Sequence, residues 1–270
     1  MCRCGNSQDP KEDSKEAVAV GGGPTPGAES ETSAKATVWG MPPSANAMGA
    51  HLFAQHVLGD DKYEFKQCNI MEGEHKTAEF AAINPFMAIP MFKDTDGTCM
   101  GESTAILLHL EAKYGNKMAD SMCTWALMMR TDKIYSGGWS DIVYPVLGFM
   151  PAVSADVLKA AIDGLYTNLA TYENTFLKGK TFVGGDAPCV ADFAMAPLIF
   201  ALKHQTIKDA TGFVLPESWC TYVDAFIAKV PGAAILSSAG GFSIGEMMDS
   251  KKPDKAVDPV AVRSVRSIST

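Results

Sequence analysis

Hydrophobic and polar residues between positions 36 and 68 follow the pattern of a strand, a helix and a second strand. Residues 36–41 form a short apolar run, and residues 45–58 have helical character. Residues 63–68 alternate between apolar and polar side chains, which is typical of a half-buried strand. The pattern therefore predicts a βαβ unit.

A β-hairpin and a closing helix are predicted next. Residues 89–93 and 98–100 flank the turn sequence Asp-Thr-Asp-Gly at residues 94–97, an arrangement that favours a hairpin. Residues 103–114 place their apolar side chains on one stripe, as a helix that covers a core does. Gly115 follows directly, and we expect it to adopt the left-handed conformation that suits glycine at a helix C-cap.

The second half of the chain shows helical spacing and no convincing strand. Apolar residues recur at intervals of four and three, which indicates a long amphipathic helix, and Ser154 precedes it as an N-cap. A variant capping box, Cys-Val-Ala-Asp at residues 189–192, begins another helix. We therefore expect an all-helical second domain. The residues that carry the spacing are Leu158, Ile162, Leu165, Leu169, Tyr172 and Phe176.

Both ends of the chain differ in composition from the middle. Residues 1–35 contain no aromatic residue and almost no branched aliphatic residue, so they cannot bury enough apolar surface to offset the entropy of ordering. Basic residues and serines gather near the other end. The sequence predicts a disordered tail over residues 1–35, a first domain over 36–116, a helical domain over 120–240 and a tail over 241–270.

The charge balance and the hydropathy narrow the class of partner. The chain has 23 Lys and Arg against 31 Asp and Glu, a net charge of −8, which disfavours nucleic acid and anionic membranes as partners. The longest apolar run, residues 193–202, has half of the roughly 20 residues that a membrane helix needs. We expect a cytoplasmic protein with no transmembrane segment and no nucleic-acid partner.

The seven cysteines are dispersed, odd in number and nowhere spaced Cys-x-x-Cys. This usage fits free thiols in a reducing compartment better than a disulfide framework. Cys2 and Cys4 form a Cys-x-Cys pair, but no second pair or histidine cluster completes a four-ligand site. We therefore expect no bound metal.

Several motifs resemble those of the cytosolic glutathione S-transferase family. Residues 84–90 (Asn-Pro-Phe-Met-Ala-Ile-Pro), 102–106 (Glu-Ser-Thr-Ala-Ile) and 113–115 (Lys-Tyr-Gly) are similar in order and spacing to the family's glutathione-site signature. Residues 41–45 (Met-Pro-Pro-Ser-Ala) resemble the delta and theta classes. The resemblance covers about residues 36–240. It implies an α/β thioredoxin-like N-terminal domain followed by an all-α helical C-terminal domain.

The resemblance assigns catalysis to Ser44. Glutathione is an anionic tripeptide whose thiol, with an ordinary pKa of about 8.5, must lose its proton to attack carbon electrophiles. In the family, a serine at this position donates its hydroxyl to the sulfur, and the helix that begins at Ala45 adds a favourable dipole. The alternative is that Ser44 only caps this helix.

The resemblance also assigns glutathione contacts to Met87, Ile89, Pro90, Glu102 and Ser103. It implies a cis Ile89-Pro90 bond, which proline allows at low cost; the alternative is a trans proline that opens an edge strand. Glu102 and Ser103, at a helix N-terminus, can hold the ammonium and carboxylate of the γ-glutamyl group; the alternative is a plain helix start. Met87 stands where delta-class sequences often have His, and it loses a polar contact to the glycyl end.

The electrophile and the partners are also implied by the resemblance. Trp125, Met128 and Tyr135 supply aromatic and thioether surface where the family binds its hydrophobic electrophile; the alternative is that they belong to the core. The family forms homodimers and needs no cofactor, since glutathione is a co-substrate. Two functions follow as hypotheses: a glutathione S-transferase that conjugates electrophiles and reduces organic hydroperoxides as a side reaction, or a catalytically silent scaffold or subunit.

Overall fold

The computed structural model describes residues 34–115 and 120–251. The tail predicted over residues 1–35, with Cys2 and Cys4, therefore lies outside the described residues except for its last two positions. Within the described ranges, no helix is both long and apolar enough to cross a bilayer.

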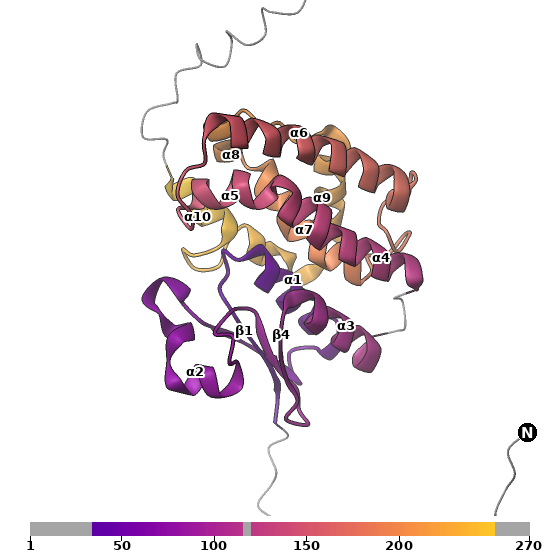
Figure 1. Cartoon of the computed structure of the whole chain (residues 1–270). Coiled ribbons are helices and arrows are strands. Elements are labelled where there is room, and N and C mark those ends of the chain that lie inside the picture. Colours follow the sequence, from indigo (N-terminus) through magenta and orange to yellow (C-terminus); the bar gives the residue numbers. More distant parts are fainter. Residues whose placement is uncertain (1–33, 116–119, 252–270) are drawn as a thin grey trace, which may run out of the picture. The chain divides into compact units, whose positions relative to one another are not determined.

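The N-terminal half folds around a four-stranded sheet in the order β2-β1-β3-β4 (Figure 1). β1 (Ala36–Gly40) runs parallel to β2 (Tyr63–Gln67) and antiparallel to β3 (Met91–Lys93), which pairs antiparallel with β4 (Cys99–Gly101). Parallel neighbours need a crossover connection, and α1 (Ala45–Leu58) supplies it. The predicted βαβ unit and hairpin are both confirmed.

Helices cover both faces of this sheet. Successive side chains of a strand point to opposite faces, so Val38 and Phe92 pack in the main core, whereas Met91 packs with Phe80 on the other face. Burial on both faces explains why β1 is largely apolar. Besides α1, the helices of this half are the 3₁₀ turns Ile70–Glu72 and Glu74–Lys76, α2 (Ala78–Ile83) and α3 (Ser103–Tyr114).

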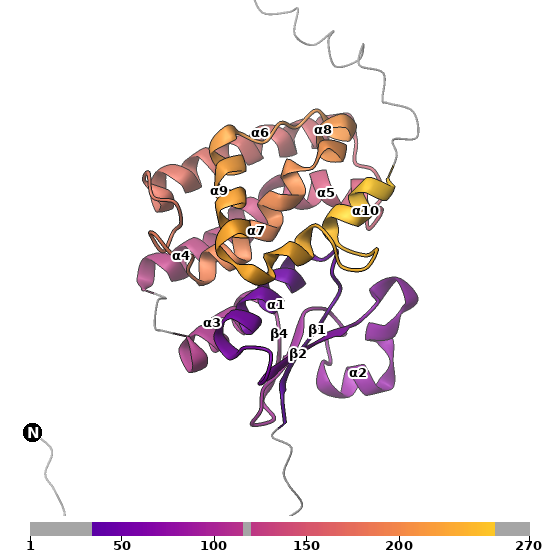
Figure 2. The ribbon, with the colours of Figure 1, turned by 180° about the vertical axis from the view of Figure 1, so that it is seen from behind.

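The C-terminal half of the described chain is helical, as the sequence predicts. α7 is the central helix of this half and contacts α4 and α9, as well as α1 of the N-terminal half (Figure 2). A wide, π-helical segment with a kink at Gly137 and Gly138 joins α4 to α5. The elements are α4 (Ser121–Met129), the π-helical segment Arg130–Trp139, α5 (Ser140–Leu147), α6 (Ala155–Tyr172), a second π-helical segment Glu173–Leu177, α7 (Val190–Lys203), α8 (Gln205–Thr211), α9 (Glu217–Lys229), the 3₁₀ helix Pro231–Leu236 and α10 (Ile244–Ser250).

Two predicted helix starts are confirmed. The hydroxyl of Ser154 accepts from the backbone nitrogen of Val157 at the start of α6. At the start of α7, the buried carboxylate of Asp192 accepts from the backbone nitrogens of Cys189, at 2.8 Å, and Val183, at 2.9 Å. The second bond ties the preceding loop to the helix, so the capping box also shapes the chain that leads into α7.

α1 and α7 join the two halves. The rings of Phe53 and Phe193 meet edge to face, 5.1 Å apart. A Cβ atom at Gly49 would lie 3.0 Å from the backbone oxygen of Phe193, so only glycine allows this approach without a shift. α1 is therefore buried between the sheet and the helical half.

Two expectations are wrong. Gly115 is extended, with a φ of −75°, rather than left-handed; its Cβ would clash with the side chain and carbonyl of Glu111, so glycine serves close packing here. The tail predicted from residue 241 contains α10, whose Ile244 and Met248 are buried. The hydroxyl of Ser243 and the carboxylate of Glu246 cap this helix reciprocally, and that local signal outweighs the polar composition around it.

Candidate active site

Ser44 is the N-cap of α1. Its Oγ accepts a hydrogen bond from the backbone nitrogen of Ala47 at 3.3 Å, and the backbone of Ser44 is extended. The side chain is partly exposed, while the residues directly before it, Pro42 and Pro43, are buried. The helix begins where the sequence predicts, and the hydroxyl stands at its positive end.

The Ile89-Pro90 bond is cis, which confirms that part of the prediction. Met87, two residues earlier, has a φ of 49°, a left-handed conformation that is uncommon for a residue with a side chain. The Met87 side chain is 43% exposed, and Ile89 is half-buried. The loop therefore presents both apolar side chain and backbone at the surface beside β3.

Glu102 and Ser103 lie at the start of α3. Glu102 is the N-cap residue, with a φ of 65°, and its side chain makes no capping bond. It is exposed, and Ser103 is half-buried. The first backbone N–H groups of a helix have no partner within it, so this end of α3 offers donors beside a free carboxylate, a combination that can hold an amino acid's charged groups.

The strand positions next to Ser44, to the cis-proline loop and to Glu102 lie at the same end of the sheet. Met91, which follows the cis proline, lies opposite Trp39 of β1 and opposite Gly101 of β4. β1 leads through a short loop to Ser44, and β4 leads directly to Glu102. The segments that lead to the predicted catalytic residue and to the predicted glutathione contacts thus adjoin strand positions that lie side by side.

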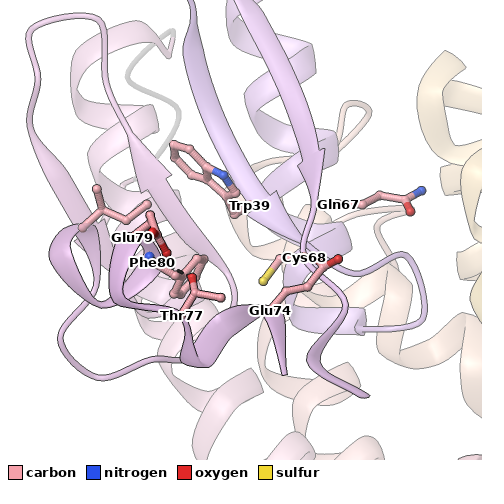
Figure 3. Close-up of a pocket in the computed structure, with 8 residues that line it drawn as sticks. Trp39, Gln67, Cys68, Glu74, Thr77, Glu79 and Phe80 are labelled. Atoms are coloured by element: carbon pink, nitrogen blue, oxygen red, sulfur yellow. Dashed lines mark hydrogen bonds between the residues drawn. The ribbon is translucent and has the colours of Figure 1, made fainter. Parts of the chain in front are cut away.

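A cavity of about 330 Å³ lies between α2 and the sheet (Figure 3). Sequence reasoning does not find it, because its lining comes from separate elements that share no motif. It lies next to the carboxyl ends of β1 and β2, and therefore near the end of the sheet to which Ser44 and Glu102 are attached. The lining residues are Trp39, Gln67, Cys68, Glu74, Thr77, Glu79, Phe80 and Ile83.

Cys68 contributes a thiol to this cavity. Burial, together with the charge of Glu74, raises the pKa of the thiol to about 11. Its backbone nitrogen donates to the carbonyl of Gly40 at 2.8 Å, which extends the pairing of β1 and β2. The thiol is protonated at neutral pH and is therefore a poor nucleophile.

Two of the three residues predicted for the electrophile, Trp125 and Tyr135, pack against different aromatic partners. The ring of Trp125 packs edge-on against Phe176, 4.9 Å away, and its side chain is 48% exposed, close to the 47% of Met128. The phenol of Tyr135 instead lies 2.7 Å from the phenol of Tyr144. Trp125 and Tyr135 therefore belong to different aromatic groups on the helical half.

A buried carboxylate fixes α3, and with it Glu102, to the hairpin. Asp94 accepts hydrogen bonds from Nε2 of His109 at 2.6 Å, from Nζ of Lys113 at 2.9 Å and from the phenol of Tyr114. Burial alone would raise the pKa of Asp94, but the hydrogen bonds from Tyr114, His109 and Lys113 outweigh it and hold the pKa below its ordinary value. Asp94 is therefore ionised at neutral pH.

Residues 34–112 match the family described as the N-terminal domain of glutathione S-transferase. Similar curated proteins include glutathione S-transferase theta-1 of Homo sapiens, 29% identical over 154 residues, and that of Bos taurus, 28% identical over 142 residues. The matches cover 53% and 48% of this chain, and 62% and 58% of those proteins. The chain thus spans about 60% of the length of these relatives.

Solved structures show the same architecture. A delta-class glutathione transferase of Nilaparvata lugens has a TM-score of 0.63 at 22% identity, over 80% of this chain and 100% of that one. Human glutathione S-transferase T1-1 has a TM-score of 0.60 at 21% identity, over 86% and 96% of the two chains. The fold is a thioredoxin-like domain followed by an all-helical domain.

Proposed function

We propose that the chain is a cytosolic glutathione S-transferase, whose N-terminal domain residues 34–112 match, and that it conjugates the thiolate of glutathione to hydrophobic electrophiles. The observation that carries this proposal is the pairing of Met91, which follows the cis Ile89-Pro90 bond, with Trp39 of β1 and with Gly101 of β4, because β1 leads to Ser44 and β4 leads to Glu102-Ser103. All of these residues lie within the stretch that matches the family.

The chemistry proposed for Ser44 is stabilisation of the thiolate. A glutathione thiol with its ordinary pKa of about 8.5 is mostly protonated at neutral pH. An O–H donor and the positive end of α1 both favour the anion over the neutral thiol. The bond from Ala47 uses only a lone pair of the Ser44 oxygen, so its proton remains available for the sulfur.

The proposed binding contacts divide glutathione between two elements, the loop with the cis proline and the start of α3. The backbone of Ile89, before the cis Pro90, pairs with the cysteinyl backbone, and Glu102 with Ser103 holds the γ-glutamyl group. Met87 offers an apolar surface where a polar contact to the glycyl carboxylate would be expected. This last feature favours weak binding, and it is the observation that supports the second hypothesis, a catalytically silent scaffold or subunit.

For the electrophile, Trp125, Met128 and Tyr135 remain our proposed surface on the first helices of the second domain. The exposed halves of Trp125 and Met128 support such a role, whereas the phenol of Tyr135 already has Tyr144 as a partner. We propose that reduction of organic hydroperoxides accompanies conjugation as a side reaction in detoxification, and that glutathione serves as co-substrate without a further cofactor.

We further propose that the protein works in the cytoplasm as a homodimer. The exposed side chain of Phe86 supports an interface, because 87% of it is accessible in the single chain and such exposure of a large apolar group is unfavourable in water.

The two hypotheses are separated by two assays. Retention on immobilised glutathione, with elution by free glutathione, together with turnover of a chlorinated aromatic substrate, is expected for the enzyme. The same matrix coupled to mercaptoethanol is the control for non-specific retention. Failure of both assays would support the scaffold, and retention without turnover would support a silent glutathione-binding subunit.

A further inference from the structure

Asn84 begins the loop that carries the cis proline, and its side chain is buried. Its Nδ2 donates to the carbonyl oxygen of Ala88 at 2.7 Å, and its Oδ1 accepts from the backbone nitrogen of Phe86 at 3.1 Å. Its own carbonyl accepts from the backbone nitrogen of Met87 at 2.9 Å. One residue thus holds the backbone of this loop at three positions.

The bond to Ala88 fixes the direction of the next N–H group. The Ala88–Ile89 peptide is trans, since the cis bond is the following one, and the C=O and N–H of a planar trans peptide point in opposite directions. Because the Ala88 carbonyl is turned toward Asn84, the N–H of Ile89 points away from Asn84. Ile89 is the residue whose backbone is proposed above to pair with glutathione.

The same amide also lies against the end of β4. A Cβ atom at Gly101 would lie 3.6 Å from Nδ2 and 3.8 Å from Oδ1 of Asn84. A methyl group at Gly101 would therefore be in ordinary van der Waals contact with the Asn84 amide, which faces this position. Since Gly101 directly precedes Glu102, Asn84 lies between the two backbone elements of the proposed glutathione site.

We propose that Asn84 is a positioning residue for glutathione, which aims the Ile89 N–H outward and holds the loop in register with Glu102. The inference rests on the proposed function. The Asn84 amide is buried, and a buried donor without a partner is costly, so its bond to Ala88 keeps that carbonyl turned toward Asn84. Without it, the Ala88–Ile89 peptide is free to rotate and the N–H of Ile89 loses its fixed direction.

The test uses Asn84→Ser in the full chain. A serine hydroxyl can still accept from the Phe86 nitrogen in the same kind of turn, but it is too short to donate to Ala88. We expect the Kd for glutathione, measured by calorimetry, to rise about tenfold, as the loss of one partly buried hydrogen bond implies. The KM for glutathione should rise by the same factor, while kcat at saturating glutathione stays within about twofold, because Ser44 is untouched.

Asn168→Ser is the matched control. Nδ2 of Asn168 donates to the carbonyl of Lys133 at 2.8 Å in the helical half, so this variant removes the same kind of bond away from the loop. Its Kd and KM for glutathione should equal those of the wild type. A lower kcat with an unchanged Kd in Asn84→Ser would indicate a merely structural role and would overturn the proposal.

A second measurement needs only the wild-type protein. In a ¹⁵N spectrum, addition of glutathione should shift the amide signal of Ile89, and an unshifted Ile89 amide in a protein that binds glutathione would overturn the proposal even if Asn84→Ser does not fold. A wild-type protein that does not bind glutathione would instead overturn the proposed function, and this inference with it. The two failures are therefore distinguishable.

Discussion

The hydroxyl oxygen of Ser44 lies 3.3 Å from the backbone nitrogen of Ala47 and accepts its hydrogen. The bond occupies one lone pair and leaves the O–H free to donate elsewhere. The sequence presents capping and thiolate stabilisation as alternatives, but this geometry makes them compatible. Both effects of removing the hydroxyl should therefore appear together in one variant.

We expect Ser44→Ala to lower the free energy of unfolding by about 1 kcal/mol, because α1 loses its cap. If the hydroxyl also stabilises the thiolate, the loss of about 1.5–3 kcal/mol of charged hydrogen bonding should raise the pKa of the bound thiol by roughly one to two units. Conjugation at neutral pH should then fall about tenfold to a hundredfold. Ultraviolet titration of bound glutathione and turnover assays measure the two effects.

Ser154→Ala is the control for this variant, because Ser154 caps α6 through a similar bond of 3.4 Å to the Val157 nitrogen. It should lose comparable stability and leave the thiol titration unchanged. If Ser44→Ala and the wild type give identical titration curves, Ser44 is a cap and not the catalytic residue.

The buried carboxylate of Asp94 should make stability depend on pH. Its pKa is lower in the folded than in the unfolded protein, so its contribution is complete above the unfolded pKa of about 3.9 and is lost as pH falls through the folded pKa. Asp94→Asn should lower the free energy of unfolding by roughly 2–3 kcal/mol at pH 7. Urea unfolding should show this difference shrinking as the pH falls below about 3.9.

Asp96→Asn is the matched control. The Asp96 carboxylate is 52% exposed and pairs with the same Lys113, and exposed ion pairs contribute little. Its loss of stability should be clearly smaller than that of Asp94→Asn. Equal losses would contradict the assignment of the stabilisation to the buried carboxylate.

Alkylation should distinguish Cys68 from Cys99. Cys68 is buried with a thiol pKa of about 11, so only about one molecule in a thousand carries the thiolate at pH 8. Cys99 is exposed. Iodoacetamide at pH 8, followed by peptide mass spectrometry, should label Cys99 at least about tenfold faster than Cys68; equal rates would mean that the cavity opens freely.

Phe86 tests the proposed dimer. The wild type should sediment at about twice the 28.8 kDa of the chain, and Phe86→Ser should shift the equilibrium toward the monomer, because burial of a large aromatic side chain contributes about 2 kcal/mol or more. Val214, 50% exposed in the helical half, provides the control Val214→Ser, which should stay dimeric. A monomeric wild type at micromolar concentration would refute the dimer.

Features that depend on a few neighbouring residues, such as helix starts, can be predicted from the sequence. The predicted start of α1 is confirmed because Ser44 marks it. At the end of α3, by contrast, a glycine signals either left-handed backbone or close packing, and the sequence alone does not tell which one applies to Gly115. The alignment of Trp39, Met91 and Gly101 is non-local, and no segment of the chain encodes it by itself. Only the family resemblance anticipates that the strands leading to Ser44 and Glu102 flank the strand that follows the cis proline.

The close approach of α1 to α7 has a consequence for dissecting the protein. Although the matched family stretch ends at residue 112, a fragment cut after the first domain would leave Phe53 and the surface around Gly49 without the helix that buries them. Such an apolar stripe in water favours aggregation. The end of the matched stretch thus marks where the family similarity stops, and we do not expect a fragment cut there to fold on its own.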